Sequence, residues 1–96
     1  MISYSNKVKL SNCFKKDIKK VLKQGRNIDD LLFVVSKLAN KSQLDDKYKN
    51  HKLEDNKYFK DCYECHIKPD WLLIYKYCDE DLLLLLIRTG SHSELF

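Results

Sequence analysis

The chain has 96 residues, enough for one domain with a thin hydrophobic core, and we treat residues 1–96 as a single domain. Apolar residues make up 44% of it and charged residues 33%, which excludes disorder, and its longest apolar run, Leu82–Ile87, is far shorter than the roughly 20 residues that span a bilayer. The net charge of +4 divides into +8 for residues 1–52 and −4 for residues 53–96. Such a basic half is typical of a protein that meets a polyanion or an acidic partner, or of a lysine-rich solvated helix face.

Two amphipathic helices are predicted in the basic half, after a short strand over residues 6–10. Apolar residues recur at helical spacing in residues 12–24 and again in residues 27–40, with lysines on most other positions of the first helix. Capping residues and a glycine stand where each helix should begin or end. These are Ser11 or Asn12, Gly25, Asn27 and Asn40.

Three strands are predicted in the acidic half, after a polar loop over residues 41–58. The turns between the strands are short, which makes the connections antiparallel hairpins. We therefore predict an α+β fold, with two N-terminal helices packed on a small, mostly antiparallel four-stranded sheet. The three strands are Phe59–Ile67, Trp71–Tyr77 and Leu82–Arg88.

The four cysteines favour a structural role. No export signal is visible in the first ten residues, so we expect a cytoplasmic protein with reduced thiols. The run Cys62–His66 matches a haem-attachment pattern, but that chemistry requires export and a haem pocket. A zinc site would need Cys65 and His66 on the same side, whereas adjacent residues of a strand face opposite sides. We therefore predict partly buried strand residues and neither metal nor cofactor. The cysteines are Cys13, Cys62, Cys65 and Cys78.

Reactive side chains are predicted to meet at one edge of the sheet. In an antiparallel meander the end of one strand lies beside the start of the next. This places five residues together, and the loop that holds His51 can fold over them. The five are His66, Asp70, Trp71, Arg88 and His92.

This set of residues suits RNA cleavage through the ribose 2′-hydroxyl. The reaction needs a base, an acid and positive charge on the phosphate, and histidine serves as acid or base near neutral pH without a metal. Arg88 supplies a permanently charged phosphate ligand, and Trp71 and Phe96 can stack on unpaired bases. The alternative is that the histidines are ordinary exposed residues and Trp71 belongs to the core.

Three segments resemble one family of proteins. His66–Lys76, Arg88–Phe96 and Tyr48–His51 look like the corresponding motifs of the YafQ family in the RelE/ParE toxin superfamily, in the same order and over essentially the whole chain. The resemblance implies a RelE-like fold and a toxin of a type II toxin–antitoxin pair. Such toxins are ribosome-dependent mRNA endonucleases (mRNA interferases) that cut codons in the ribosomal A site.

The resemblance also implies site residues. It implies that His92 is the general acid, that Asp70 or His66 is the base, and that Arg88 holds the phosphate. His51 and Phe96 would position the RNA. Further RNA contacts are assigned to Trp71, Lys49, Lys52 and Lys68.

The implied partners are the ribosome with its mRNA and an antitoxin that resembles DinJ, with a ribbon-helix-helix half. A complex of two toxins with two antitoxins, a monomer when free, and no membrane contact are expected. The chain departs from the family at Tyr63, where arginine is common, and in the loop over residues 53–60, which lacks the usual glycine. Both departures put the codon preference in doubt.

Two other functions remain open from the sequence. One is a gyrase-inhibiting toxin of the ParE kind, which the three histidines disfavour. The other is a non-catalytic module that binds RNA or protein through the basic helices.

Overall fold

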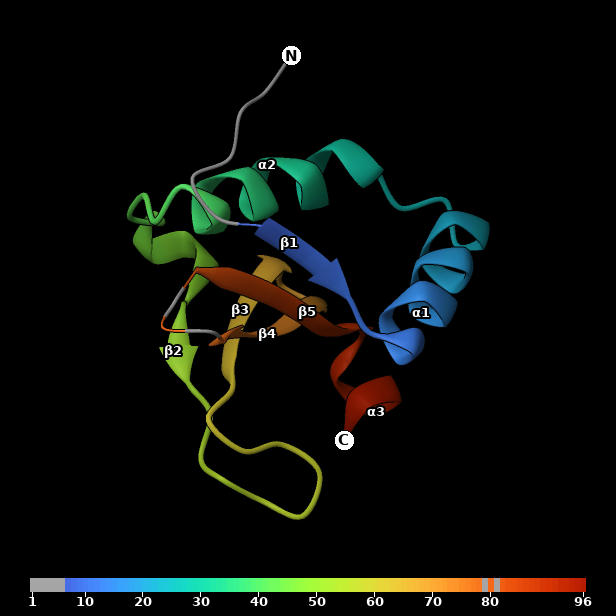
Figure 1. Ribbon diagram of the computed structural model, residues 1–96. Helices are drawn as coiled ribbons and strands as arrows, with labels where there is room; N and C mark the ends of the chain where they lie inside the picture. Colours follow the sequence, from blue (N-terminus) through green and yellow to red (C-terminus); the bar gives the residue numbers. More distant parts are fainter. Residues whose placement is uncertain (1–6, 79, 81) are drawn as a thin grey trace.

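Two helices lie over one face of a five-stranded sheet in the computed structural model, which describes residues 7–78, 80 and 82–96 (Figure 1). The expected strand start at Asn6 and part of the expected turn at residues 78–81 lie outside the described residues. Among the described residues, no helix is long and apolar enough to cross a membrane. The elements are β1 (Lys7–Leu10), α1 (Asn12–Lys23), α2 (Ile28–Ala39), a short 3-10 helix η1 (Asp46–Tyr48), β2 (His51–Lys52), β3 (Tyr63–Lys68), β4 (Trp71–Cys78), β5 (Leu83–Gly90) and α3 (His92–Leu95).

The sheet confirms the predicted α+β class and corrects the number of strands. Its order is β1-β5-β4-β3-β2, and all neighbouring pairs are antiparallel except β1 with β5, which are parallel. The fifth strand, β2, has two residues and lies inside the segment predicted as a loop, as does η1. Elements this short have no hydrophobic period, so the pattern of the sequence does not reveal them.

The helix ends follow the predicted capping residues. The Ser11 side chain accepts a hydrogen bond from the Phe14 amide, and the Asn27 side chain accepts one from the Asp29 amide. Gly25, just after α1, has φ +76°, a conformation that glycine adopts without strain. Local sequence therefore determines where both helices begin and where α1 ends.

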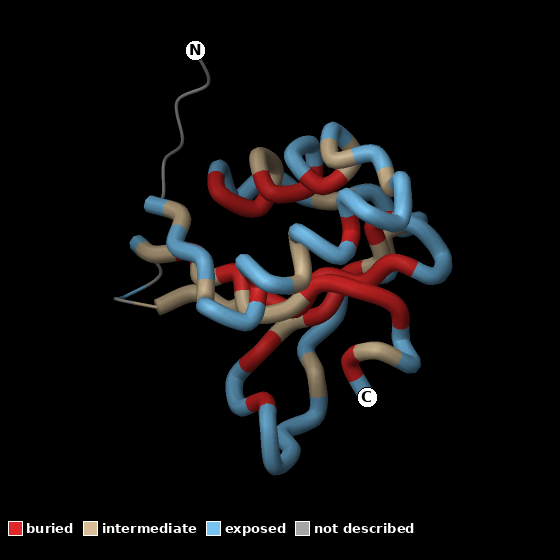
Figure 2. The backbone as a smooth tube through the Cα atoms, turned by 90° about the vertical axis from the view of Figure 1, so that its right-hand side faces the viewer, coloured by how far each residue is buried: buried red, intermediate tan, exposed pale blue. Residues whose placement is uncertain are grey.

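The alternation of side chains along β4 separates two hydrophobic clusters. Trp71, Leu73 and Tyr75 point to the side covered by α1 and α2, which we call the helix face. Leu72 and Ile74 point to the other side, the opposite face, and join a smaller cluster with Phe59, Cys62 and Leu95. The segment over residues 53–62 and α3 both lie on this opposite face (Figures 1 and 2). The expected strand start at Phe59 is wrong, because β3 begins at Tyr63 and Phe59 packs in the smaller cluster.

Trp71 belongs to the main core, so its predicted role in RNA stacking is wrong. Only 1% of the residue is exposed, and its indole Nε1 donates a 2.8 Å hydrogen bond to the Thr89 hydroxyl. The Arg26 guanidinium lies 5.5 Å from the ring centroid. A central strand buries its aromatic residues because helices cover that face, and no ring face is left for a base.

The burial of Trp71 can be tested by fluorescence because it is the sole tryptophan. We expect emission typical of an apolar environment and protection from iodide quenching. Single-stranded RNA should leave the emission unchanged. Strong quenching by iodide would contradict this placement of the indole.

Candidate active site

A buried carboxylate, Glu64 of β3, lies between two histidines. Its Oε1 atom is 3.5 Å from Nε2 of His66 and 3.8 Å from Nε2 of His51, and 7% of Glu64 is exposed. His66 is two residues further along β3, so both side chains leave the strand on the same face. His51 is the cross-strand partner of Glu64 in β2. Because a buried charge needs partners, this pairing accounts for the position of both imidazoles.

The second ring nitrogen of each histidine faces a backbone carbonyl. Nδ1 of His51 lies 2.8 Å from the Lys49 oxygen, and Nδ1 of His66 lies 3.4 Å from the Pro69 oxygen. A carbonyl oxygen only accepts, so each Nδ1 is the donor. Each imidazole therefore has an oxygen atom near both of its nitrogens, and these contacts orient the ring.

Arg88 shares a row of the sheet with this group. The register runs from His51 to Glu64, then Ile74, then Arg88 across β2, β3, β4 and β5. Two strand spacings separate Glu64 from Arg88, roughly 10 Å between their backbones. The register shifts just before Arg88, and such irregularities often redirect side chains near active sites. The apolar side chains of Leu72 and Ile74 thus lie on the opposite face between the two histidines and Arg88.

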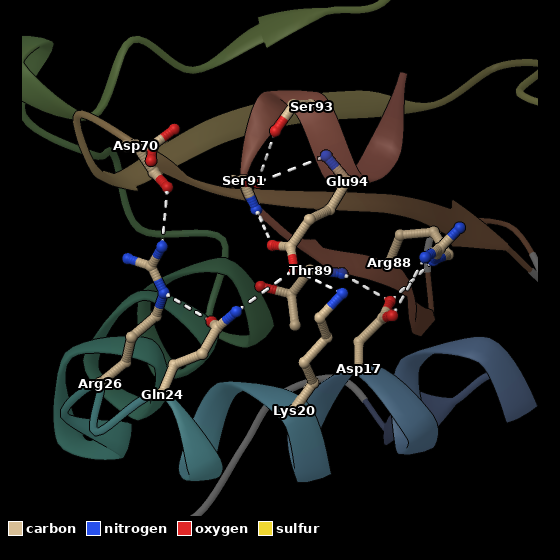
Figure 3. Close-up of polar contacts among 10 residues, drawn as sticks. All are labelled: Asp17, Lys20, Gln24, Arg26, Asp70, Arg88, Thr89, Ser91, Ser93 and Glu94. Atoms are coloured by element: carbon tan, nitrogen blue, oxygen red, sulfur yellow. Dashed lines mark hydrogen bonds and ion pairs between the residues drawn. The ribbon is translucent and has the colours of Figure 1, made fainter.

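A carboxylate on α1 holds the Arg88 guanidinium. Asp17 accepts hydrogen bonds from Nε at 2.7 Å and from Nη2 at 3.0 Å, and it also accepts one from the Thr89 amide (Figure 3). These hydrogen bonds raise the pKa of Arg88 above its already high ordinary value. A guanidinium has five N–H groups, so one carboxylate satisfies only two of them. Asp17 therefore orients Arg88 and leaves it able to contact a phosphate as well.

The C-terminal helix α3 carries His92 and Phe96 onto the opposite face. His92, Leu95 and Phe96 are three and four residues apart, which puts them on one side of a helix. Leu95 is buried with Leu72 and Ile74, and the rings of His92 and Phe96 lie 5.0 Å apart. The Phe96 ring also meets the ring of Phe59 edge-on at 5.9 Å. These contacts join α3 to the segment before β3.

Polar contacts to α1 fix the position of α3. Ser91 and Glu94 form a capping box, and Glu94 also pairs with Lys20 at 2.6 Å and accepts a hydrogen bond from Gln24 at 3.2 Å (Figure 3). The Lys20 ammonium, followed by the Ser91 amide and hydroxyl, lowers the pKa of Glu94 to about 2. The Arg26 guanidinium donates one hydrogen bond to the Gln24 side chain and one to the Asp70 carbonyl. The α1 helix thus anchors β5 and α3, and Arg26 in the loop after it anchors the β3–β4 turn.

The structure brings together only some of the predicted site residues. His51 and His66 share Glu64, His92 and Phe96 touch each other, and Arg88 lies on the same face through the sheet register. Their catalytic roles stay predictions. Asp70 is exposed in the β3–β4 turn, and in the described part of the chain no hydrogen bond or ion pair joins its carboxylate to a histidine.

The three predicted RNA-binding lysines are all exposed. Lys68 pairs with Asp30 at 3.5 Å, and Lys52 lies 3.9 Å from Asp61. Lys49 has φ +48°, and its carbonyl is the one that faces His51. All three lie on or beside the elements that carry His51 and His66.

Sequence reasoning missed Glu64 and Asp17. Alternation along β3 already places Glu64 and His66 on one face, so that signal was present. Asp17 is three residues after Phe14 and four before Val21, both of them buried, and is the only acid on a lysine-rich helix. A single acid in the buried stripe of such a helix indicates a cationic partner elsewhere in the fold.

Cys62 and Cys65 are buried and contribute packing, whereas Cys13 is exposed on α1, so the predicted strand position is wrong for Cys13. Burial raises the pKa of the Cys65 thiol to about 12, and burial also raises that of Cys62. Both thiols stay protonated at neutral pH, as expected for inert core residues. Within residues 7–78, 80 and 82–96, no three His, Cys, Asp or Glu side chains are grouped so as to hold a metal ion.

Known proteins share this sequence and this fold. A curated "mRNA interferase toxin YafQ" of Escherichia coli strain B/BL21-DE3 is 36% identical over 90 residues, which are 93% of this chain and 94% of that protein. The crystal structure of a metal-bound toxin from Helicobacter pylori matches with a TM-score of 0.86 and 43% identity, covering 95% of this chain and 99% of that one. A crystal structure of the E. coli DinJ–YafQ toxin–antitoxin complex matches with a TM-score of 0.83 and 33% identity, covering 96% and 98%.

These likenesses and the family comparison define the class of the protein as a small bacterial toxin of a type II toxin–antitoxin system. Residues 6–96 match the sequence model of one family in that class, described as "Bacterial toxin of type II toxin-antitoxin system, YafQ". The chain belongs to the YafQ family, which confirms the resemblance seen in its motifs.

The Glu94 contacts make stability depend on pH in a defined direction. The pKa of Glu94 in the folded state is about 2, below its ordinary value of 4.5. The ionised group therefore stabilises the fold fully above pH 4.5, and this contribution is lost as the pH falls toward 2. At pH 7, Glu94→Gln keeps the capping box but removes the charge that pairs with Lys20, so it should lower the free energy of unfolding by about 0.5 kcal/mol.

Urea unfolding at pH 7 and at pH 3 measures this effect. The difference between wild type and Glu94→Gln should shrink at pH 3. Glu54→Gln, a change of an exposed acid, should differ little from wild type at either pH. An equal loss for Glu94→Gln at both pH values would show that its charge does not anchor α3.

Proposed function

We propose that this protein is a ribosome-dependent mRNA endoribonuclease that cuts codons in the A site. The observation that carries the proposal is the Glu64 carboxylate between His51 and His66, on the same face as Arg88 and His92, in a chain of the YafQ family. The name of the E. coli relative, an mRNA interferase toxin, supports the same activity here.

The chemistry is acid–base cleavage through the 2′-hydroxyl. A base removes the 2′-hydroxyl proton, the 2′-oxygen bonds to phosphorus, and the 5′-oxygen leaves with a proton from the acid, giving a 2′,3′-cyclic phosphate and a 5′-hydroxyl. We assign His92 as the acid and His66, supported by Glu64, as the base. Arg88 binds the phosphate oxygens, whose charge increases in the transition state. His51 and Phe96 position the RNA.

The choice of His66 over Asp70 as the base rests on contacts. The Glu64 carboxylate lies 3.5 Å from Nε2 of His66 and orients the ring on the face that also carries Arg88. Asp70 is exposed in a turn and is tied to Arg26 through its backbone.

The partners proposed for this chain are the ribosome with its mRNA and a DinJ-like ribbon-helix-helix antitoxin. The DinJ–YafQ complexes among the similar structures support an antitoxin partner. We propose two toxins with two antitoxins in the neutralised form and a monomer when free. The +8 half of the chain suits ribosomal RNA and an acidic antitoxin arm. Such a toxin works in the cytoplasm, where translating ribosomes are found.

Removal of the proposed acid tests this function. His92→Ala should slow mRNA cleavage in a translating extract by about 100-fold or more, as is usual when a general acid is lost. Ser93→Ala, the neighbouring exposed position of α3, should cleave like wild type. Primer extension on the mRNA measures both rates.

Two results would refute the assignment. Unchanged cleavage by His92→Ala would show that His92 is not the acid. Double-strand DNA breaks with intact mRNA would identify a gyrase-inhibiting toxin instead.

A further inference from the structure

A second feature, a cleft of about 620 Å³, adjoins the two histidines. It lies between α2, η1 and the end of β3, and His66 is one of its lining residues. Lys49 lines it as well, and the Lys49 carbonyl is the acceptor for Nδ1 of His51. The cleft therefore continues directly from the candidate active site.

The short length of β2 leaves room for this cleft. β2 pairs with β3 only at Tyr63 and Glu64, although β3 continues to Lys68. In the part of the chain that the structure describes, no strand pairs with that outer side of β3 beyond Glu64. The chain instead forms η1 and the left-handed turn at Lys49, and these make the wall across from β3.

Two aromatic rings line the cleft. Phe33 of α2 is 51% exposed, and its ring centroid lies 6.4 Å from that of Tyr48, with 32° between the planes. The Lys37 ammonium lies 5.6 Å from the Phe33 ring centroid, and the Lys47 ammonium lies 5.3 Å from that of Tyr48. A base that stacks on these rings therefore takes the place of flexible lysine side chains. Base–aromatic stacking is a common way to hold unpaired nucleotides.

The charges of the cleft suit a base flanked by phosphates. Lys47, Lys49 and Lys68 place cations around it. Asp29 and Asp30, in the first turn of α2, supply carboxylates that accept hydrogen bonds from the amino groups of bases.

We propose that this cleft binds one unpaired base of the mRNA beside the cut phosphate, stacked on Phe33 and Tyr48. The proposal rests on the proposed function and adds a specificity subsite to it. His66 acts at the phosphate while the neighbouring base enters the cleft. The cleft thus provides the aromatic contact that the buried Trp71 does not.

The test compares two adjacent positions of α2. Phe33 lines the cleft, whereas Leu32 is equally exposed, at 50%, and lies outside it. Cleavage of mRNA in a translating extract should be about tenfold slower for Phe33→Ala, within the range for loss of one base stack. It should also show weaker preference for the base at one position beside the cut. Leu32→Ala should match wild type, and Phe33→Trp, which keeps a stacking ring, should restore the rate.

Fluorescence of 2-aminopurine placed beside the cut in the mRNA gives a direct readout. Wild type and Leu32→Ala should quench it by stacking, and Phe33→Ala should not. Equal rates and equal quenching for Phe33→Ala and Leu32→Ala would overturn the subsite. Normal cleavage by Phe33→Ala with loss of neutralisation by the antitoxin would also overturn it and identify a protein-binding cleft. Absence of cleavage by the wild-type protein would refute the proposed function itself, and the subsite with it.

Discussion

The alternation of side chains along β4 is the constraint on which the rest of the structure depends. Trp71, Leu73 and Tyr75 go under the helices, and Leu72 and Ile74 go to the other side. A one-residue slip would exchange the two sets. Because the large core occupies the helix face, the opposite face is left with a small cluster and a group of polar side chains. The main hydrophobic core and the residues of the proposed active site therefore lie on different sides of β4.

Several residues of the basic half contact residues of the acidic half within the folded protein. Lys20 and Arg26 of the +8 half pair with Glu94 and with the Asp70 carbonyl of the −4 half, while Asp17 receives Arg88 (Figure 3). The Asp17–Arg88 pair is partly buried, so salt screens it less than an exposed pair. The charged side chains of the first half thus suit an anionic partner, and those of α1 also hold β5 and α3 in place.

Helices and long strands were predictable because they carry a hydrophobic period and local caps, as at Ser11 and Asn27. The short strand β2 and the helix α3 carry no such period and depend on partners far along the chain. Antiparallel connections predict that His66, Arg88 and His92 lie at one end of the sheet, but they do not distinguish its two faces. Trp71 shows the consequence, since it lies at that end and faces the core. Alternation along β3 places Glu64 beside His66, but its pairing with His51 depends on the short strand β2, which the sequence pattern does not reveal.

The charge of Glu64 tests the account most directly, because it lies between both histidines. Glu64→Gln keeps the shape of the side chain and removes the charge, and Glu54→Gln makes the same change at an exposed loop position. With ribosome-bound mRNA under single-turnover conditions, the account predicts cleavage slower by tenfold or more for Glu64→Gln, with little change in its unfolding midpoint and wild-type rates for Glu54→Gln. Equal rates for Glu64→Gln and wild type would contradict an active site built on the His51–Glu64–His66 group.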